Sequence, residues 1–299
     1  MQSRKNFKFV DHPWISFWIL LILIIISILL SAIFIFGLIR LPPNNPLSQF
    51  TQSLFGHLLL VFLFIPFILR LPKGKRTFKE YLDDIRLTRI SPFFQLILIA
   101  ISCYIILMLC QSLGSFVFRL LEGKAITGEF IRSVFNIKGE LPPESLSLLI
   151  SLPSIFEEVI FRGVLLTYLL HKYSKRKAII FSSFGFAIIH IFNILGGRDP
   201  VWVVGQIIWA FMLGLFYGYL FVQTGSLLPN MLFHYLSNVF VGAFNSYIQS
   251  TASIETQALY GVIFTFGLMP TILMILWTKF FTTKWSFKSR FTETDLTIS

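Results

Sequence analysis

Long apolar runs separated by short polar segments dominate this sequence. A helix needs about 20 residues to cross the hydrocarbon core of a bilayer, and eight of the runs approach or exceed that length. Only a helix satisfies its backbone hydrogen bonds within one apolar segment, so each run predicts a transmembrane helix. The pattern therefore predicts an all-α, polytopic membrane protein. Its eight helices are expected near 14–39, 53–69, 93–118, 145–170, 178–195, 201–222, 227–248 and 258–277.

The composition supports this fold class and excludes others. Hydrophobic residues make up 55% of the 299 residues and charged residues only 13%, against about 25% charged in a soluble domain. A soluble enzyme, a disordered chain and a disulfide framework are therefore excluded. Cys103 and Cys110 lie seven positions apart, about 10 Å along one helix. That separation is too great for a disulfide, so we expect two packed core residues.

The basic residues are distributed unevenly between the segments that connect the helices. With the N-terminus in the cytoplasm, the inner segments hold 18 of the 25 Lys and Arg, the outer loops hold six, and Arg162 lies inside a span. This is the positive-inside pattern of a multi-pass protein of the cell membrane, with both termini cytoplasmic. Anionic lipid at the inner surface accounts for the net charge of +11. No nucleic-acid partner is needed.

The predicted helices divide the chain into three parts. Residues 1–144 contain three transmembrane helices and an outer loop at 119–144. Residues 145–248 form the expected catalytic core, and 249–299 the last helix and a basic cytoplasmic tail. We also expect an amphipathic helix at 77–90 on the inner surface. Thr77 and Glu80 have the spacing of a capping box at its start. Four apolar side chains then fall on one face of the helix: Phe78, Tyr81, Leu82 and Ile85.

Several predicted spans contain polar side chains that are costly inside a bilayer. An ionisable group in this setting indicates function by default. They are Glu157, Glu158 and Arg162 on the fourth span, His190 on the fifth, His234 with Asn238 on the seventh, and His57 on the second. His57 falls at the outer end of its predicted span. We therefore expect it to be an interfacial residue and not part of a site.

The fourth span carries two adjacent carboxylates and one cation. Glu158 and Arg162 are spaced i, i+4, so they face each other on the helix and should form an ion pair. Glu157 lies about 100° around the helix and is left to handle protons. The alternative is that all three residues form only an ion network for helix packing, but such a network has no need for the second Glu.

The fifth and seventh spans add imidazoles and an amide. Phe186 precedes His190 by four residues, and His234 precedes Asn238 by four. Glu157 with His190 can activate a water molecule, while His234 and Asn238 can donate hydrogen bonds to a scissile carbonyl. Equally, one carboxylate and two imidazoles (Glu157, His190 and His234) match a catalytic zinc set with an open position.

The rise of a helix gives the depth of each group from the inner end of its span. At about 1.5 Å per residue, Glu157, His190 and Asn238 fall in one layer, near the midplane or on its cytoplasmic side. His234 falls about 8 Å nearer the cytoplasm by the same estimate. Zinc ligands must all lie about 2 Å from one ion, so this offset favours a glutamate-type mechanism with no metal cofactor over the zinc alternative.

Three motifs on separate spans together resemble a known family. E-E-x-x-x-R, F-x-x-x-H and H-x-x-x-N, in this order, are similar to the CAAX-protease and bacteriocin-processing family (CPBP), also called Abi or Rce1-like proteases. The resemblance covers about 145–240. It implies an eight-helix intramembrane endopeptidase with a water-filled cavity. In this sequence Glu157 and His190 would activate water, and His234 and Asn238 would stabilise the oxyanion; Glu158, Arg162 and Phe186 would support them.

The substrate and two competing functions stay open at this stage. The short loops and the Phe-, Ile- and Lys-rich composition look bacterial, where farnesylated peptides are not expected. A peptide precursor or a segment of a membrane protein is the expected substrate. A bacteriocin-immunity or scaffold protein without turnover, or a proton-coupled transporter, would present the same spans. Substitution of Glu157 separates these functions, because only the protease would lose cleavage.

Overall fold

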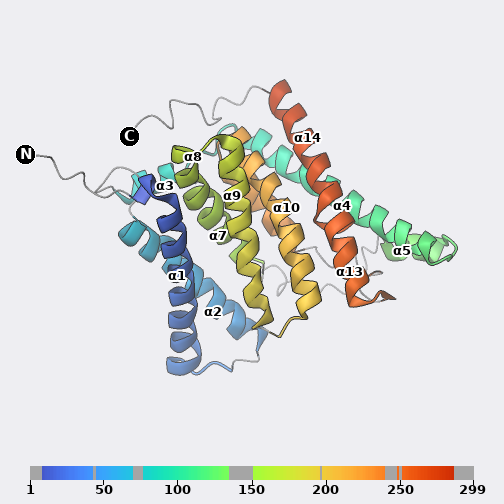
Figure 1. Cartoon of the computed structure of the whole chain (residues 1–299), viewed down its shortest axis with the longest axis horizontal. Helices are drawn as coiled ribbons and strands as arrows, with labels where there is room; N and C mark the ends of the chain where they lie inside the picture. Colours follow the sequence, from blue (N-terminus) through green and yellow to red (C-terminus); the bar gives the residue numbers. More distant parts are fainter. Residues whose placement is uncertain are drawn as a thin grey trace, which may run out of the picture.

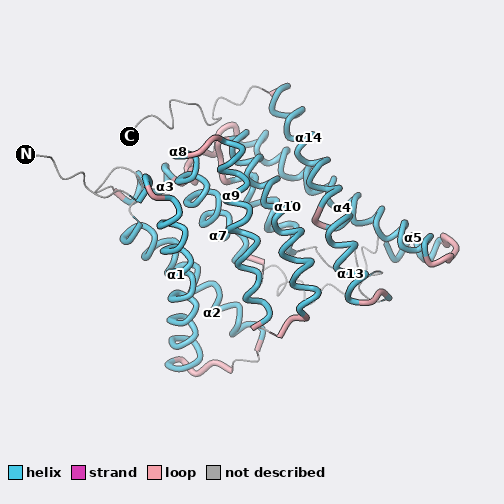
Figure 2. Tube along the Cα trace, in the orientation of Figure 1, coloured by secondary structure: helices cyan, strands magenta, loops and turns pink. Residues whose placement is uncertain are grey.

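The computed structural model is helical throughout the residues that it describes, which are 9–42, 45–69, 77–134, 151–195, 197–239, 248 and 251–285. Figures 1 and 2 show long helices running side by side, with no strand in the described part of the chain. Six helical segments are long and apolar enough to cross a membrane: Pro13–Leu38, Pro46–Leu69, Phe93–Leu121, Lys175–Ile194, Pro200–Thr224 and Ile254–Lys284. The predicted all-α, multi-pass membrane protein is confirmed.

Several of these segments combine an α-helix with a stretch of 3₁₀- or π-helix. In chain order they are η1 (Phe9–Asp11), α1 (Pro13–Ala32) with η2 (Ile33–Leu38), α2 (Pro46–Leu59) with η3 (Leu60–Leu69), α3 (Phe78–Asp84), α4 (Phe93–Leu121), α5 (Gly128–Val134), α7 (Pro153–Glu158) with η4 (Val159–Leu166) and α8 (Thr167–Lys172), α9 (Lys175–Ile188) with η5 (Ile189–Ile194), α10 (Pro200–Thr224), α11 (Leu228–Val239), and α13 (Ile254–Tyr260) with η6 (Gly261–Thr265) and α14 (Leu268–Lys284). η1 and η5 are 3₁₀-helical, and the other η segments are π-helical.

Two of the eight predicted spans differ from the six plain apolar ones. The fourth, Pro153–Lys172 in the described residues, is continuous helix but contains two carboxylates and an arginine. The seventh is described over only 12 residues, as α11. These two helices supply most of the ionisable side chains singled out in the sequence. The total of eight spans stays a prediction.

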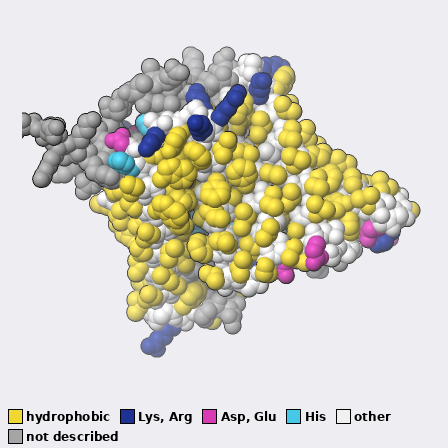
Figure 3. Space-filling model, viewed as in Figure 1, with side chains coloured by type: hydrophobic (Ala, Val, Ile, Leu, Met, Phe, Trp, Pro, Cys, Tyr) yellow, Lys and Arg dark blue, Asp and Glu magenta, His cyan; other side chains and the backbone are white. Residues whose placement is uncertain are grey.

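The two ends of the helix bundle differ in their charged residues. The start of α9 and the ends of α8 and α14 share one edge of the molecule (Figure 1), and Figure 3 shows Lys and Arg side chains gathered there. We call this edge the basic rim. Its exposed members are Lys172, Lys175, Arg176, Lys177, Lys279 and Lys284. α10 begins at the opposite edge, where Asp199 caps its first turn by accepting hydrogen bonds from two backbone N–H groups.

The inner loop, residues 77–90, packs against the bundle. The predicted capping box is present: the Thr77 hydroxyl accepts from the Glu80 N–H at 3.3 Å, and the Glu80 carboxylate accepts from the Thr77 N–H at 2.9 Å. The helix ends at Asp84 and is therefore shorter than predicted. Tyr81 is buried and donates its hydroxyl proton to the Val61 carbonyl at 2.9 Å, and Ile85 is fully buried. Tyr81 and Ile85 of the predicted apolar face therefore pack against protein, whereas Phe78 is exposed. The predicted position on the inner membrane surface stays a prediction.

α11 begins inside the molecule, beneath this inner loop. Thr224, Ser226 and Leu227, which join α10 to α11, have no exposed surface. The Leu227 N–H donates to the carbonyl of Arg86 in the inner loop at 3.5 Å. Gly163 leaves room for this contact, because a Cβ there would lie 3.1 Å from Ile85 Cβ and 3.2 Å from Leu227 Cδ1. The start of α11 is therefore recessed from the basic rim.

The two cysteines and the predicted outer loop complete the first half of the chain. Cys103 and Cys110 are free thiols and buried in α4, as expected. In the predicted outer loop, α5 packs through Phe130, over which the Arg119 guanidinium lies at 4.9 Å from the ring centroid. Residues 135–144 of that loop lie outside the described residues.

Candidate active site

Glu158 is the centre of a buried hydrogen-bond network. Its side chain has no exposed surface. Oε1 accepts from Nη1 of Arg162 at 3.2 Å and lies 2.8 Å from Nδ1 of His234, and Oε2 accepts from Nδ2 of Asn230 at 3.3 Å. The predicted ion pair between Glu158 and Arg162 is confirmed. Three partners from two helices compensate the cost of burying this carboxylate.

The Arg162 guanidinium lies between two aromatic rings. Its central carbon is 4.4 Å from the ring centroid of Phe186 on α9 and 4.7 Å from that of Tyr217 on α10. Nη2 also donates to the Gly214 carbonyl at 3.4 Å. Cation–π contacts strengthen when both groups are desolvated. The cation therefore links three helices, and Phe186 has the supporting position that the sequence predicted.

The Glu157 side chain is partly exposed, whereas that of Glu158 is buried. The side chain of Glu157 is 25% exposed, and Oε2 lies 3.9 Å from Nε2 of His234. The His234 imidazole thus faces one glutamate with each ring nitrogen, Glu158 at Nδ1 and Glu157 at Nε2. The structure separates the two adjacent carboxylates into a buried one within a network and an accessible one beside an imidazole.

His190 completes the cluster from α9 and η5. Its ring packs edge-on against Phe186 with a centroid distance of 5.3 Å, and the same Phe186 ring packs against His234 at 5.9 Å. Phe186 therefore packs against both imidazoles and keeps them near each other.

Asn238 stands apart from the other predicted site residues. It lies on α11 one turn beyond His234, with an exposed side chain that makes no hydrogen bond with another described residue. The structure brings together Glu157, Glu158, Arg162, Phe186, His190 and His234. It leaves the exposed Asn238 side chain on the same helix as His234, without a hydrogen bond to any of these six described residues.

Two residues of the site were missed by the sequence analysis. Asn230 is fully buried and donates both to Glu158 and to the Tyr217 carbonyl, the latter at 2.8 Å. Tyr217 also stacks on His234 with a centroid distance of 5.0 Å. Asn230 precedes His234 by one helical turn, so its position was a usable signal. Tyr217 lies on an apolar helix and carries no such signal.

The predicted depths of the site residues need correction. His234 lies beside Glu157, where helix rise had placed it about 8 Å nearer the cytoplasm. That estimate assumed that the seventh span starts at the membrane surface, whereas α11 starts inside the bundle. Glu157 and His190 each lie fifteen residues from the basic rim, counted from Lys172 and Lys175, or about 22 Å. By this estimate the site lies near the middle of the bundle, and its position relative to the membrane midplane stays a prediction.

The zinc alternative can be tested against the donor geometry. Among the described residues, no three His, Cys, Asp or Glu side chains form a group that could hold a metal ion. The Nδ1 atom of His234 is within hydrogen-bond distance of Glu158, and Nε2 faces Glu157. Glu157, His190 and His234 do not make up such a group in this arrangement, and the metal-free mechanism stays a prediction.

The expectation for His57 was wrong in its depth. The second span starts at Pro46, seven residues earlier than predicted, so His57 lies midway along it. Its Nδ1 donates to the Ser53 carbonyl at 2.8 Å, and its ring lies 6.0 Å from that of Phe156. His57 is thus within the bundle next to α7, although it does not touch the cluster around Glu158.

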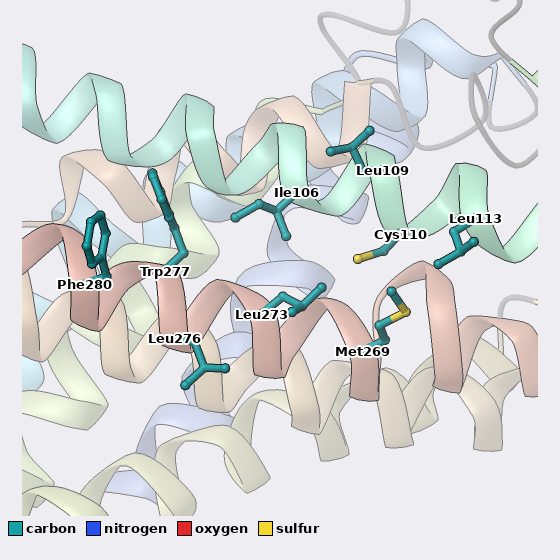
Figure 4. A pocket seen from close by; sticks show the side chains of 9 residues that line it. All are labelled: Ile106, Leu109, Cys110, Leu113, Met269, Leu273, Leu276, Trp277 and Phe280. Atoms are coloured by element: carbon teal, nitrogen blue, oxygen red, sulfur yellow. The ribbon is translucent and has the colours of Figure 1, made fainter.

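The structure also has an apolar groove away from the site. Its volume is ≈ 570 Å³, and it lies between α4 and α14 (Figure 4). The lining residues are Ile106, Leu109, Cys110 and Leu113 of α4 and Met269, Leu273, Leu276, Trp277 and Phe280 of α14. None of them is ionisable apart from the Cys110 thiol, and none belongs to the predicted site.

Comparison with known proteins agrees with the three motifs. Residues 143–240, one third of the 299-residue chain, match the family described as type II CAAX prenyl endopeptidase Rce1-like. No curated protein and no solved structure gives a significant match to the chain. Over this third of the chain, the match supports the resemblance to the Rce1-like, or CPBP, family that the three motifs indicated. Every residue of the candidate site falls within the matched segment.

Proposed function

We propose that this protein is an intramembrane endopeptidase in which Glu157 is the general base. The observation that carries the proposal is the placement of His234, whose ring nitrogens face the buried Glu158 and the accessible Glu157. An accessible carboxylate beside an oriented imidazole is the arrangement that general-base catalysis needs. The match of residues 143–240 to a family of prenyl endopeptidases supports the same proposal.

The contacts of Glu158 assign one proton of His234. Glu158 pairs with Arg162, and an ionised carboxylate only accepts hydrogen bonds, so Nδ1 of His234 is the donor in their contact. The proposed scheme further requires a proton on Nε2 of His234 when the oxyanion forms.

The hydrolysis then follows from these positions. Glu157 removes a proton from a water molecule that His190 helps to orient, and the water oxygen bonds to the scissile carbonyl carbon. Negative charge develops on the carbonyl oxygen, where the Nε2–H of His234 donates a hydrogen bond. The C–N bond breaks, and Glu157 returns its proton to the leaving amine. Asn238, one turn along α11, is the second oxyanion donor in this scheme once a peptide is bound. The scheme needs no metal.

We propose peptides or membrane-protein segments in the bacterial cell membrane as substrates. The experiment is a comparison of membrane peptides from cells that produce the wild-type protein and from cells that produce Glu157→Gln at equal levels. We expect a peptide pair, precursor and product, in which the product disappears in the variant. Identical peptide sets from wild-type and variant cells, across growth conditions in which the protein is abundant, would contradict the proposal.

A further inference from the structure

We propose that the active site receives its substrate from the edge opposite the basic rim. Within the proposed protease function, this defines the substrate class as peptides and membrane-protein segments exposed on the non-cytoplasmic face. Two independent features of the bundle support it. The side towards the basic rim is closed by packed protein, and the side away from it carries half-buried and exposed amides.

The helix that leads from Glu157 towards the basic rim is buried throughout. All eight residues of η4, which directly follows Glu158, are buried, as are the next four residues of α8 up to Leu170. Tyr168, in this stretch, donates its hydroxyl proton to the Leu69 carbonyl at 3.0 Å and so fixes α8 to the end of η3. No side of this stretch offers a route for a peptide.

The inner loop closes the same side from the other direction. Ile85 packs against Gly163 and Leu227, and the Arg86 carbonyl accepts from the Leu227 N–H. Leu227 begins α11, which carries His234. Among the described residues, the start of α11 and Ile85 therefore pack closely between the rim and the catalytic layer, since Ile85 and Leu227 have no exposed surface.

On the side of the catalytic residues away from the rim, several described side chains are amides. Asn193 follows His190 by three residues in the 3₁₀-helical η5, so it lies on the same face about 6 Å further from the rim. Its Nδ2 donates to Oε1 of Gln206 on α10 at 2.7 Å. Gln206 is six residues from the start of α10, or about 9 Å, and both amides are half-buried. Asn238 likewise lies beyond His234 and is exposed.

The Asn193–Gln206 pair has the chemistry to hold a peptide backbone. After their mutual hydrogen bond, Asn193 keeps a carbonyl acceptor and Gln206 keeps N–H donors. A peptide bond presents the complementary N–H and C=O groups. An extended chain advances about 3.3 Å per residue, so the pair would contact the substrate about two residues from a scissile bond held at His190. This gives the approach side a sequence-tolerant binding subsite.

Thiol labelling tests the direction of access without requiring catalysis. In a Cys103→Ala, Cys110→Ala background, single cysteines are introduced as Asn193→Cys and Asn238→Cys in the approach region. Lys175→Cys marks the basic rim and Arg198→Cys marks the opposite edge. A membrane-impermeant maleimide is then applied to intact cells and to inverted membrane vesicles, and total thiol is measured after denaturation.

We expect Asn193→Cys and Asn238→Cys to react from the same side as Arg198→Cys, with at least a 10-fold preference over the side from which Lys175→Cys reacts. Reaction from the Lys175→Cys side would overturn the proposal, and so would protection from both sides with full reactivity after denaturation. Because labelling does not depend on turnover, an inactive protein with this pattern would contradict the proposed function and leave the direction of access standing.

A kinetic test addresses the amide pair itself. Asn193→Ala and Gln206→Ala should each raise KM about 5- to 10-fold, equivalent to one lost hydrogen bond, for substrates that extend past the subsite, with kcat unchanged. Substrates truncated to end before it should not distinguish the variants from wild type. An equal loss for long and truncated substrates would assign the pair a structural role only.

Discussion

His234 Nδ1 lies 2.8 Å from Oε1 of Glu158, and this contact joins α11 to α7 at the centre of the bundle. It fixes the ring so that Nε2 faces Glu157. A buried carboxylate that orients a functional imidazole is a frequent device, because it fixes both ring orientation and protonation. In this protein the same carboxylate also compensates Arg162. Glu158 therefore both stabilises the buried core through Arg162 and orients the His234 imidazole.

Removal of the arginine should destabilise the protein more than it affects chemistry directly. Arg162→Ala leaves Glu158 as a buried charge without its cation, which is expected to cost about 3–5 kcal/mol. The measurement is thermal unfolding in detergent together with the yield of monodisperse protein. Arg198→Ala, at an exposed arginine whose guanidinium lies 5.6 Å from the Trp202 ring centroid, is the matched control and should unfold like wild type. Equal stability of both variants would show that the buried pair has no structural role.

Asn230→Leu tests the residue that the sequence analysis missed. Leucine keeps the volume but removes the donor to Glu158 Oε2 and to the Tyr217 carbonyl. We expect a loss of about 1–3 kcal/mol, because two buried acceptors lose a partner. Chemical denaturation monitored by tryptophan fluorescence gives the difference from wild type. An unchanged midpoint for Asn230→Leu would remove this amide from the site network.

Gly163 should tolerate no larger side chain, because the inner loop approaches it closely. A valine there would press against Ile85 and Leu227 and displace the loop from the start of α11. We expect a destabilisation of about 1–3 kcal/mol and increased proteolysis within 77–90. Gly128→Val is the control, since nothing lies within 4 Å of a Cβ at that position. Resistance of the Gly163→Val loop to proteolysis would contradict the docked arrangement.

The sequence predicted the fold class, the ion pair and most of the site because these follow from local rules. Apolar length defines spans, and i, i+4 spacing brings Glu158 to Arg162 whatever the surrounding helices do. The depth of His234 could not be predicted in this way. It depends on where α11 starts, and the burial of Leu227 beneath the inner loop is a tertiary contact between segments far apart in the chain.

The same reasoning explains the error at His57 and the packing of the inner loop. Polar residues between Pro46 and Gln52 hid the true start of the second span, although Asn45 caps it and Pro46 follows at the first helical position. The apolar face of α3 was read correctly as a face. Periodicity alone does not say whether lipid or protein covers such a face, and here Tyr81 and Ile85 pack against protein.

The metal-free mechanism makes a separate prediction. Purified active protein should contain no stoichiometric zinc and should keep its activity in 1,10-phenanthroline, because catalysis rests on Glu157 and the oriented imidazoles. Elemental analysis and a chelator titration on the same preparation provide the test. Loss of activity with chelator and recovery with added zinc would require His190 and His234 to rearrange into ligands.

The most direct test of the central claim compares two isosteric substitutions at adjacent positions. Glu157→Gln and Glu158→Gln are purified, and kcat and the unfolding temperature are measured for each. We expect Glu157→Gln to lose about 10²- to 10⁴-fold in kcat while unfolding like wild type, because the accessible carboxylate acts as the base. We expect Glu158→Gln to lower the unfolding temperature, because the buried Arg162 guanidinium loses its counter-charge. Wild-type turnover by Glu157→Gln would contradict the account.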